Sequence, residues 1–451
     1  MKLNKIIISI GLIITALAVI AYYNNQDKSE IESSDKPNEP VNEISITTQQ
    51  DAIINNITVF LENSGSMFSY ERGANNYFRT DINKLFDLLN DTQEKIPEWN
   101  FLAVNSDIHE LDINLNHFTD GNIVYTQDVR IGEMTQTDFS IIFERTLQNA
   151  NNNDGLSILI SDLIYSTQNQ DNNGAESVAA SFESLVKREF RESSKETAII
   201  VMKMNSPYRG NYYPNFSDLP SFPIDQNRPY YILLIGKNSI INSLVKSKKL
   251  NNYEVLKNEF SGFEDYFVFF NPDKTSNIYY TALPYSSKPV LFSASKETLK
   301  GNNPIKSLFF RSNIANSNGS FYLAIDFMGI SMFNNYLNNI TNYSISTNNF
   351  SIDSIASVTD LSLAQLDKRK LLTCTNILQI NVSNIHEMAM ILKLKNKMPD
   401  WIYNTSSLTD GIDNTVGTNT TFGFEYFMKG LRSAYGVKDD LFSININLKQ
   451  D

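Results

Sequence analysis

The most informative stretch of this sequence is a short apolar run that ends abruptly at an acidic residue. Residues 57–67 read ITVFLENSGSM, and the apolar run stops at Glu62. Brief β-prone apolar runs of this kind are typical of fully buried parallel strands. Open α/β sheets bind their ligands at the carboxyl ends of such strands. The stretch therefore predicts a strand of an α/β sheet with a ligand site directly after it.

The residues after this run carry oxygen at alternate positions. Glu62, Ser64 and Ser66 are spaced i, i+2, i+4, and all three side chains end in oxygen. Hard oxygen donors suit a hard divalent cation such as Mg²⁺. We therefore expect these three residues to contribute to a metal site.

Apolar strands and amphipathic helices alternate from about residue 52 to residue 250. In the first predicted helix, which begins near Thr80 or Asp81, apolar residues recur with a period of 3.6 residues. The alternation predicts a doubly wound, mostly parallel sheet. The further predicted strands are 101–104, 122–125, 156–160, 198–204 and 230–235. Four predicted helices each have one apolar face, which consists of Ile82, Leu85, Phe86 and Leu89; Phe139, Ile142, Phe143 and Leu147; Val178, Phe182, Leu185 and Val186; and Ile240, Ile241, Leu244 and Val245.

Two more polar residues stand where strands end or helices begin. Thr137 lies just before the helix that starts near Phe139, and Asp162 follows the strand at 156–160. Each residue also has an ordinary structural interpretation, because Thr caps helices and Asp is common in turns. Both interpretations stay open from the residues alone.

The order of these features resembles the von Willebrand factor A (VWA) domain, whose metal-ion-dependent adhesion site begins with Asp-x-Ser-x-Ser after a buried strand. The resemblance covers about residues 52–250. It implies that Ser64, Ser66 and Thr137 bind Mg²⁺ directly and that Glu62 and Asp162 act directly or through water. It also implies that one metal position stays open for a carboxylate of a protein partner.

This sequence departs from the VWA pattern at two positions. Glu62 stands where the family has Asp, and Leu163 replaces the usual glycine after the second acid. The longer arm of Glu62 displaces its carboxylate, and Mg²⁺ tolerates displaced ligands poorly. Ca²⁺, Mn²⁺ or no metal are therefore the alternatives to Mg²⁺.

A segment rich in aromatic residues and proline separates the last two predicted strands. We expect residues 206–229 to form a long connection, in which Tyr208, Tyr212, Tyr213, Phe216 and Phe222 are spaced by prolines. Long loops in compact domains are usually functional or disordered. These aromatic side chains either form a stiff recognition surface or cover the sheet edge and dock on the second domain.

The apolar pattern changes to a period of two in residues 255–451. Examples are the apolar residues at alternate positions in 321–327, 378–382 and 444–448. Such strands bury one face, as in antiparallel sheets. We expect a β-rich domain, a sandwich, with one helix near 424–435. This half resembles no family that we can name.

The amino terminus predicts export from the cytosol. Lysines precede an apolar run that ends at Tyr23, so residues 1–23 form an uncleaved signal anchor or a removed signal peptide. Residues 24–50 are polar and acidic and read as a disordered linker. The anchored form gives a single-pass membrane protein with a periplasmic or extracellular C-terminal part, and the cleaved form gives a secreted protein.

Composition excludes several classes of function. A net charge of −12 argues against a nucleic-acid partner, which requires a basic patch. With one cysteine and three histidines, none in HExxH spacing, zinc hydrolases and histidine-based triads are poor candidates. Ser64 or Ser66 could act as a nucleophile, but no histidine lies at a matching strand end to serve as its base. We therefore do not expect an enzyme. The expected function is a metal-dependent protein-binding module, and the alternative is a metal-free scaffold in a cell-envelope assembly.

Overall fold

The computed structural model describes residues 53–451 except 73–76, 92–94, 120–128, 153, 166–173, 215–218, 272–277, 285–291, 296–302, 359–369, 372, 410–414 and 437. The predicted signal segment (1–23), the predicted linker (24–50) and the predicted strand at 122–125 lie outside the described residues. Among the helices of the described part of the chain, none combines the length and the hydropathy needed to cross a bilayer.

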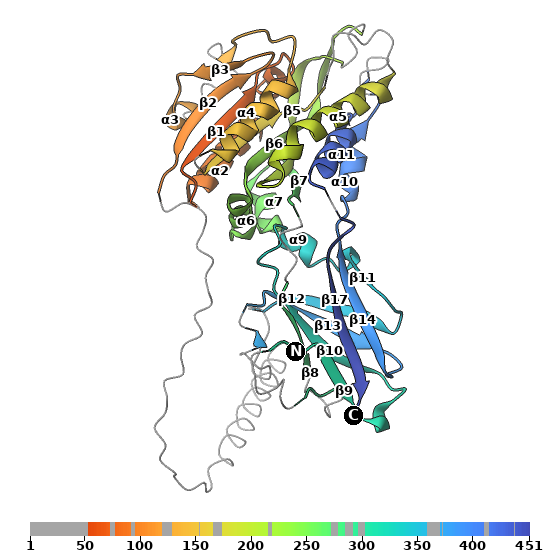
Figure 1. Cartoon of the computed structure of the whole chain (residues 1–451). Helices are drawn as coiled ribbons and strands as arrows, with labels where there is room; N and C mark the ends of the chain where they lie inside the picture. Colours follow the sequence, from red (N-terminus) through yellow and green to blue (C-terminus); the bar gives the residue numbers. More distant parts are fainter. Residues whose placement is uncertain are drawn as a thin grey trace, which may run out of the picture. The chain divides into compact units, whose positions relative to one another are not determined.

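The chain has an α/β architecture built on a mixed central sheet of seven strands in the order β3-β2-β1-β4-β6-β5-β7 (Figure 1). β1 pairs with β2 and β4 in parallel, and β5 runs in the same direction, whereas β3, β6 and β7 run opposite to it. The strands are β1 (Asn56–Glu62), β2 (Glu98–Val104), β3 (Ile108–Leu111), β4 (Gly155–Ser161), β5 (Thr197–Tyr212), β6 (Phe222–Lys237) and β7 (Phe263–Phe269).

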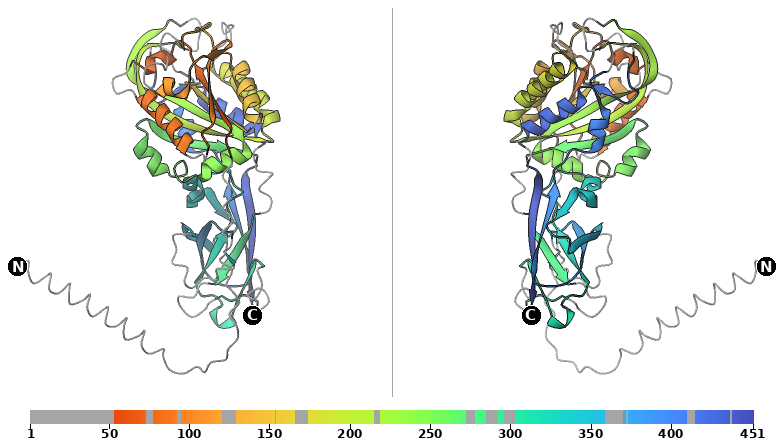
Figure 2. Two further views of the ribbon diagram at one scale, coloured as in Figure 1. Left: turned by 90° about the vertical axis from the view of Figure 1, so that its left-hand side faces the viewer. Right: turned by 90° about the vertical axis from the view of Figure 1, so that its right-hand side faces the viewer.

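Helices cover both faces of this sheet (Figure 2). α2 (Tyr77–Asp91) lies on one face, and α4 (Phe139–Asn151) and α5 (Ala175–Ser193) lie on the other. The remaining helical segments of this part are η1 (Met67–Tyr70), α3 (Leu115–Thr119), α6 (Asn238–Lys246) and α7 (Tyr253–Glu259). The predicted inward faces of α2, α4 and α6 are buried throughout, and on α5 only Leu185 is partly exposed. The helical periodicity is therefore confirmed.

The prediction of a long connection at 206–229 is wrong. These residues extend β5 and β6 into a two-stranded ribbon that stays in register from Ser206↔Arg228 to Tyr212↔Phe222. β7 pairs with β5 only up to Met204, so among the described residues no further strand pairs with the ribbon. Proline is tolerated at such an edge because its missing N–H does not have to bond to a neighbouring strand. Tyr208, Tyr212 and Phe222 are buried, which favours the alternative in which the aromatic side chains of this segment cover the sheet edge. Of the described residues among the five aromatics, Tyr213 alone is exposed. Phe216 lies outside the described residues.

The second half contains two further sheets of four strands, in the orders β12-β13-β10-β8 and β11-β14-β17-β9. The predicted alternation is confirmed, since Phe321, Leu323, Leu378, Ile380 and Ile446 are fully buried. The elements are β8 (Tyr280–Pro284), β9 (Ser307–Phe310), η4 (Ser312–Ile314), β10 (Gly319–Ile325), α9 (Asn334–Leu337), η5 (Ile340–Asn342), β11 (Tyr343–Ile345), β12 (Phe350–Ser357), β13 (Asn376–Val382), β14 (Met388–Lys395), α10 (Asp400–Thr405), β15 (Ser406–Ser407), β16 (Thr421–Phe422), α11 (Phe424–Ala434) and β17 (Asp440–Gln450).

The segment from α10 to α11 returns to the central sheet. α11 packs against α5, and the Phe424 ring stacks on Tyr231 of β6 at 4.2 Å between centroids. The Tyr231 hydroxyl donates to Thr421 Oγ1 at 3.0 Å or accepts from it. Residues from the C-terminal half therefore complete the core on one face of the seven-stranded sheet.

Candidate metal centre

Two acidic residues meet at the carboxyl ends of adjacent parallel strands. Glu62 is the last residue of β1, and Asp162 directly follows β4. The parallel register pairs Leu61 with Ile160, so the two chains leave the sheet at the same level. Glu62 is 1% exposed and Asp162 is 2% exposed. Two carboxyl groups are thus buried side by side at the edge where α/β sheets bind ligands.

Hydroxyl groups surround the Glu62 carboxylate. Thr137 Oγ1 donates to Glu62 Oε1 at 2.8 Å, and Ser161 Oγ donates to Oε2 at 2.5 Å. Burial and the nearby charge of Asp162 raise the pKa of Glu62 to about 7, although the hydroxyls of Ser161, Thr137 and Ser64 act in the opposite direction. The two acids therefore repel each other in a place where water cannot screen them.

Three groups interact with the Asp162 carboxylate: a backbone N–H, a hydroxyl and a guanidinium. Its Oδ1 accepts from the backbone N–H of Ile164 at 3.2 Å. Burial raises its pKa, and the Ser66 hydroxyl and the guanidinium of Arg228 partly offset this effect. Ser66 Oγ and Ser64 Oγ lie 3.1 Å apart. Ser66 thus connects Asp162 to the loop that follows β1.

Thr137 reaches the site from the loop before α4. The N-cap of α4 is Asp138, whose carboxylate accepts from the N–H groups of Ser140 and Ile141. The alternative interpretation of Thr137 as the helix cap is therefore wrong, and its hydroxyl is directed to Glu62 instead. The same loop is fixed to the β1 loop by a hydrogen bond from Gly65 N to Met134 O at 3.1 Å.

The structure thus brings together all five residues singled out in the sequence. They come from three loops that are distant in the chain and that converge at one edge of the sheet. The residues are Glu62, Ser64, Ser66, Thr137 and Asp162.

Leu163 occupies the backbone position where the VWA pattern has glycine. Its φ angle is +54°, in the left-handed region that side chains other than glycine rarely adopt. The side chain is fully buried. Burial of the leucine side chain offsets a strain of roughly 1–2 kcal/mol. The turn after β4 is therefore of the kind that favours glycine, although the sequence departs from the pattern.

Arg228 is a residue of the site that sequence reasoning missed. It is 1% exposed, donates to the carbonyl of Gly417 at 2.7 Å and lies over the Tyr212 ring at 4.8 Å. Its positive charge acts on Asp162 and on Tyr70, whose hydroxyl donates to Pro229 O at 2.5 Å. Arg228 thus supplies a buried cation whose charge acts on Asp162, from a segment that was expected to be a loop.

The donor set fits a hard divalent cation. Within the described residues, no three His, Cys, Asp or Glu side chains form a cluster that holds an ion. The candidate set has two carboxylates and three hydroxyls, which are the oxygen ligands that Mg²⁺ and Ca²⁺ prefer. A divalent cation would also offset the burial and the repulsion by Asp162 that together raise the pKa of Glu62. The residues present are therefore chemically suited to Mg²⁺, Mn²⁺ or Ca²⁺.

An exposed aromatic ring borders this site. A Cβ atom added to Gly65 would lie 3.3 Å from the Tyr213 ring, so the ring lies against the metal loop. Tyr213 is 46% exposed. The end of the β5–β6 ribbon thus places an accessible phenol beside Ser64 and Ser66.

Comparison of the sequence with protein-family models and with curated proteins gave no match.

Proposed function

We propose that this chain is an exported, membrane-tethered binding module of the VWA type. Its divalent cation, held by Glu62, Ser64, Ser66, Thr137 and Asp162, engages an acidic residue of a protein partner. The tether is the apolar segment 1–23, the β-rich part is a sandwich, and the setting is the cell envelope.

One observation carries the proposal. Two buried carboxylates and three hydroxyls, from three segments that are separate in the sequence, interact in succession from Thr137 through Glu62, Ser64 and Ser66 to Asp162 at the carboxyl edge of the sheet. Such an arrangement is costly for a purely structural role, because buried like charges repel each other. A divalent cation turns the repulsion into attraction. A partner carboxylate then completes the oxygen shell that Mg²⁺ requires.

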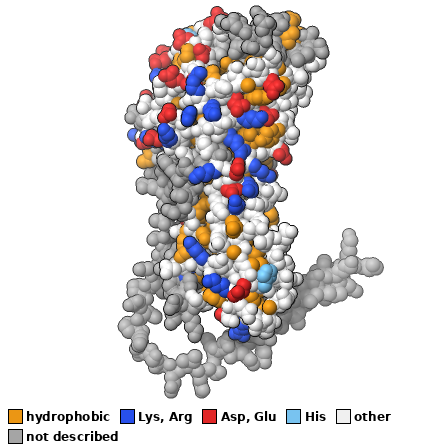
Figure 3. Space-filling view, turned by 45° about the vertical axis from the view of Figure 1, so that its right-hand side comes forward, with side chains coloured by type: hydrophobic (Ala, Val, Ile, Leu, Met, Phe, Trp, Pro, Cys, Tyr) orange, Lys and Arg blue, Asp and Glu red, His pale blue; other side chains and the backbone are white. Residues whose placement is uncertain are grey.

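The surroundings favour a protein partner over a nucleic acid. Tyrosine is enriched in protein interfaces, and Tyr213 lies exposed beside the metal loop. On the face drawn in Figure 3, acidic and basic side chains are interspersed and do not gather into a basic patch. The net charge of −12 has the same implication.

A metal-free scaffold is the second candidate, and a specific observation favours it. The Glu62 carboxylate already accepts hydrogen bonds from Thr137 and Ser161, and the charge of Arg228 acts on Asp162. The acid pair is thus partly compensated by the chain itself. In that case the domain would act in an envelope assembly through its surface alone.

Metal binding can be tested by thermal unfolding of the full chain in EDTA, Mg²⁺, Mn²⁺ and Ca²⁺. A ligand at a hundred times its Kd stabilises the folded state by about 2.7 kcal/mol. We expect Mg²⁺ or Mn²⁺ to raise the melting temperature and the Ser64→Ala/Ser66→Ala double variant to lose that rise. A matched control is Ser181→Ala/Ser184→Ala, because the bonds of both hydroxyls within the described part of the chain go to carbonyls of their own helix.

The same measurement separates the two candidate functions. If no divalent ion changes the melting temperature of the wild-type chain, the metal-dependent module is refuted and the scaffold remains. If an ion stabilises the chain, capture of a partner from intact envelopes is compared with and without EDTA. Capture that is unchanged by EDTA and by the Ser64→Ala/Ser66→Ala variant would refute the adhesive role.

A further inference from the structure

A lysine, a glutamate and an asparagine lie in contact at the outer side of the seven-stranded sheet, apart from the candidate metal ligands. Lys203 and Asn205 belong to β5, and Glu264 belongs to β7. Lys203 Nζ lies 2.6 Å from Glu264 Oε2, and Asn205 Nδ2 donates to Glu264 Oε1 at 2.7 Å. One carboxylate therefore contacts an amine with one oxygen and a primary amide with the other.

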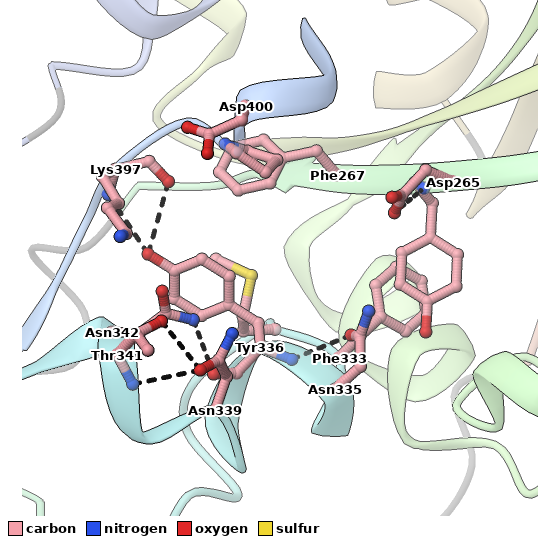
Figure 4. A pocket seen from close by; sticks show the side chains of 13 residues that line it. Asp265, Phe267, Phe333, Asn335, Tyr336, Asn339, Thr341, Asn342, Lys397 and Asp400 are labelled. Carbon is pink, nitrogen blue, oxygen red and sulfur yellow. Dashed lines mark hydrogen bonds between the residues drawn. The ribbon is translucent and has the colours of Figure 1, made fainter.

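An irregularity in the strand pairing gives Glu264 this position. The register of β5 and β7 shifts directly after the pair Lys203↔Asp265, so Glu264 is an extra residue on β7. Bulges of this kind change the direction of a side chain. The neighbouring Asp265 lines a hollow beside β7, and its Oδ1 accepts from the backbone N–H of Tyr266 at 2.8 Å (Figure 4). Glu264 is therefore the acid that bridges Lys203 and Asn205.

The amine of this cluster is buried more deeply than the acid. The side chain of Lys203 is 3% exposed and that of Glu264 is 29% exposed. Burial lowers the pKa of Lys203, although the hydrogen bond and charge of Glu264 and the charge of Asp265 act in the opposite direction. Burial thus favours the neutral amine, which is the nucleophilic form of lysine.

The amide is oriented with its nitrogen toward the acid. An ionised carboxylate only accepts hydrogen bonds, so the NH₂ group of Asn205 has to face Glu264. Within the described part of the chain the buried Oδ1 of Asn205 accepts no hydrogen bond. The nitrogen of this amide therefore lies beside the group that can protonate it.

The spacing of the two side chains allows them to meet. Alternate residues of a strand point to the same face and lie about 6.6 Å apart along it. The flexible four-carbon stem of Lys203 can cover this distance, because the side chain of Asn205 is short and directed to the same carboxylate. Holding the two groups on one carboxylate also replaces a bimolecular encounter by a local one.

We propose that Lys203 and Asn205 become joined by an intramolecular amide bond. Glu264 accepts a proton from the lysine ammonium, and the neutral Nζ attacks Cγ of Asn205. Glu264 then gives this proton to Nδ2 and takes a second proton from Nζ. The Cγ–Nδ2 bond breaks, and ammonia leaves with the second proton as ammonium. The reaction uses no oxidant, and the positive charge of the buried lysine leaves with the ammonium.

Tryptic peptide mapping of the full-length protein by mass spectrometry tests this proposal. Trypsin cleaves an unmodified chain after Lys203 and gives the peptides 196–203 and 204–209. The amide bond blocks this cleavage, so we expect one peptide, 196–209, lighter than its sequence mass by one ammonia molecule. A succinimide at Asn205 also loses ammonia, but it leaves the chain cleavable after Lys203 and lightens 204–209 instead.

Two variants test the roles of the side chains. Glu264→Gln removes the proton carrier, and Lys203→Arg keeps the positive charge in a group that is not deprotonated in proteins. Both variants should be cleaved after residue 203 and show unmodified masses. Asp154→Asn is the matched control, because it removes the partner of another β-strand lysine, Lys237, and it should keep the linked peptide.

Three results would overturn the proposal. The first is a wild-type map in which 196–203 and 204–209 appear at their sequence masses. The second is a mass deficit confined to 204–209, which would indicate the succinimide. The third is a linked peptide in Glu264→Gln at the wild-type level, which would remove Glu264 from the reaction. The wild-type map decides by itself if a variant fails to fold.

Discussion

Replacing Glu62 by glutamine should stabilise the metal-free protein at alkaline pH and abolish its response to metal. The substitution removes one of two repelling charges and keeps the shape of the side chain. The glutamine oxygen can accept from Ser161, and its NH₂ group can donate to Thr137, whose hydroxyl then acts as acceptor. The variant thus isolates the cost of a charged Glu62, which arises first from its burial and second from the nearby charge of Asp162.

The size of the effect follows from the pKa of Glu62. Each pKa unit corresponds to about 1.36 kcal/mol, so the rise from 4.5 to about 7 corresponds to about 3 kcal/mol. Because the folded state binds this proton more tightly than the unfolded state, the stability of the metal-free protein falls as pH rises from about 4.5 to about 7. Above pH 7 the full cost is present, and Glu62→Gln should remove up to about 3 kcal/mol of it.

The assay is thermal unfolding in EDTA from pH 5 to pH 8. We expect Glu62→Gln to melt above the wild type at pH 8 and the difference to shrink toward pH 5, where Glu62 is protonated. At a hundred times Kd, Mg²⁺ should return about 2.7 kcal/mol to the wild type alone, which nearly cancels the advantage of the variant. Glu98→Gln is the control, because Glu98 is exposed on β2.

Two outcomes would refute this reasoning. If the Glu62→Gln variant melts below the wild type in EDTA at pH 8, the hydrogen bonds of the carboxylate outweigh the cost of its burial beside Asp162. A stabilisation that does not depend on pH would mean that the effect does not arise from ionisation of Glu62.

Four further results are expected. Thr137→Ala should lose most of the Mg²⁺-induced rise in melting temperature and Thr137→Ser should keep it, because only the hydroxyl is used. Leu163→Gly should lower the free energy of unfolding by about 1–3 kcal/mol in urea titrations, because the lost burial exceeds the relieved strain. Asp81→Asn should cost about 1–3 kcal/mol by the same method, because the buried carboxylate accepts from two backbone N–H groups before β7 and an amide satisfies only one. Tyr213→Ala should weaken partner capture from envelopes and leave the Mg²⁺ shift unchanged.

The helices of the α/β part could be predicted because burial selects one face of each. On α2 the apolar residues recur every three to four positions, and the predicted face is fully buried. The start of α2 was less predictable. It begins at Tyr77, three residues before Thr80. Helix ends depend on local caps and on tertiary contacts such as those of Asp81, which period alone does not reveal.

The β5–β6 ribbon shows where local signals mislead. Pro207, Pro223 and Pro229 are turn and loop signals in a single sequence, yet here they lie in paired strands. Whether proline disrupts a strand depends on whether its missing N–H faces a neighbour, and that is a property of the whole sheet. The edge position of the ribbon is not visible in the residues themselves, so the long-loop prediction followed from sound rules and was still wrong.

The candidate site divides in the same way between local and distant information. Glu62, Ser64 and Ser66 are near one another in the chain, and Thr137 and Asp162 stand at helix and strand ends, so type and position together made them predictable. Arg228 had no such signal, because its role depends on the ribbon that brings its charge near Asp162.

The buried charge of Arg228 bears directly on the choice between the two proposed functions. If Arg228 fully compensates Asp162, a divalent cation gains little, and Arg228→Met should then increase the Mg²⁺-induced rise in melting temperature. If the cation and Arg228 hold different carboxylate oxygens, removal of Arg228 should leave that rise unchanged while lowering the stability in EDTA, because Asp162 then loses its compensating charge.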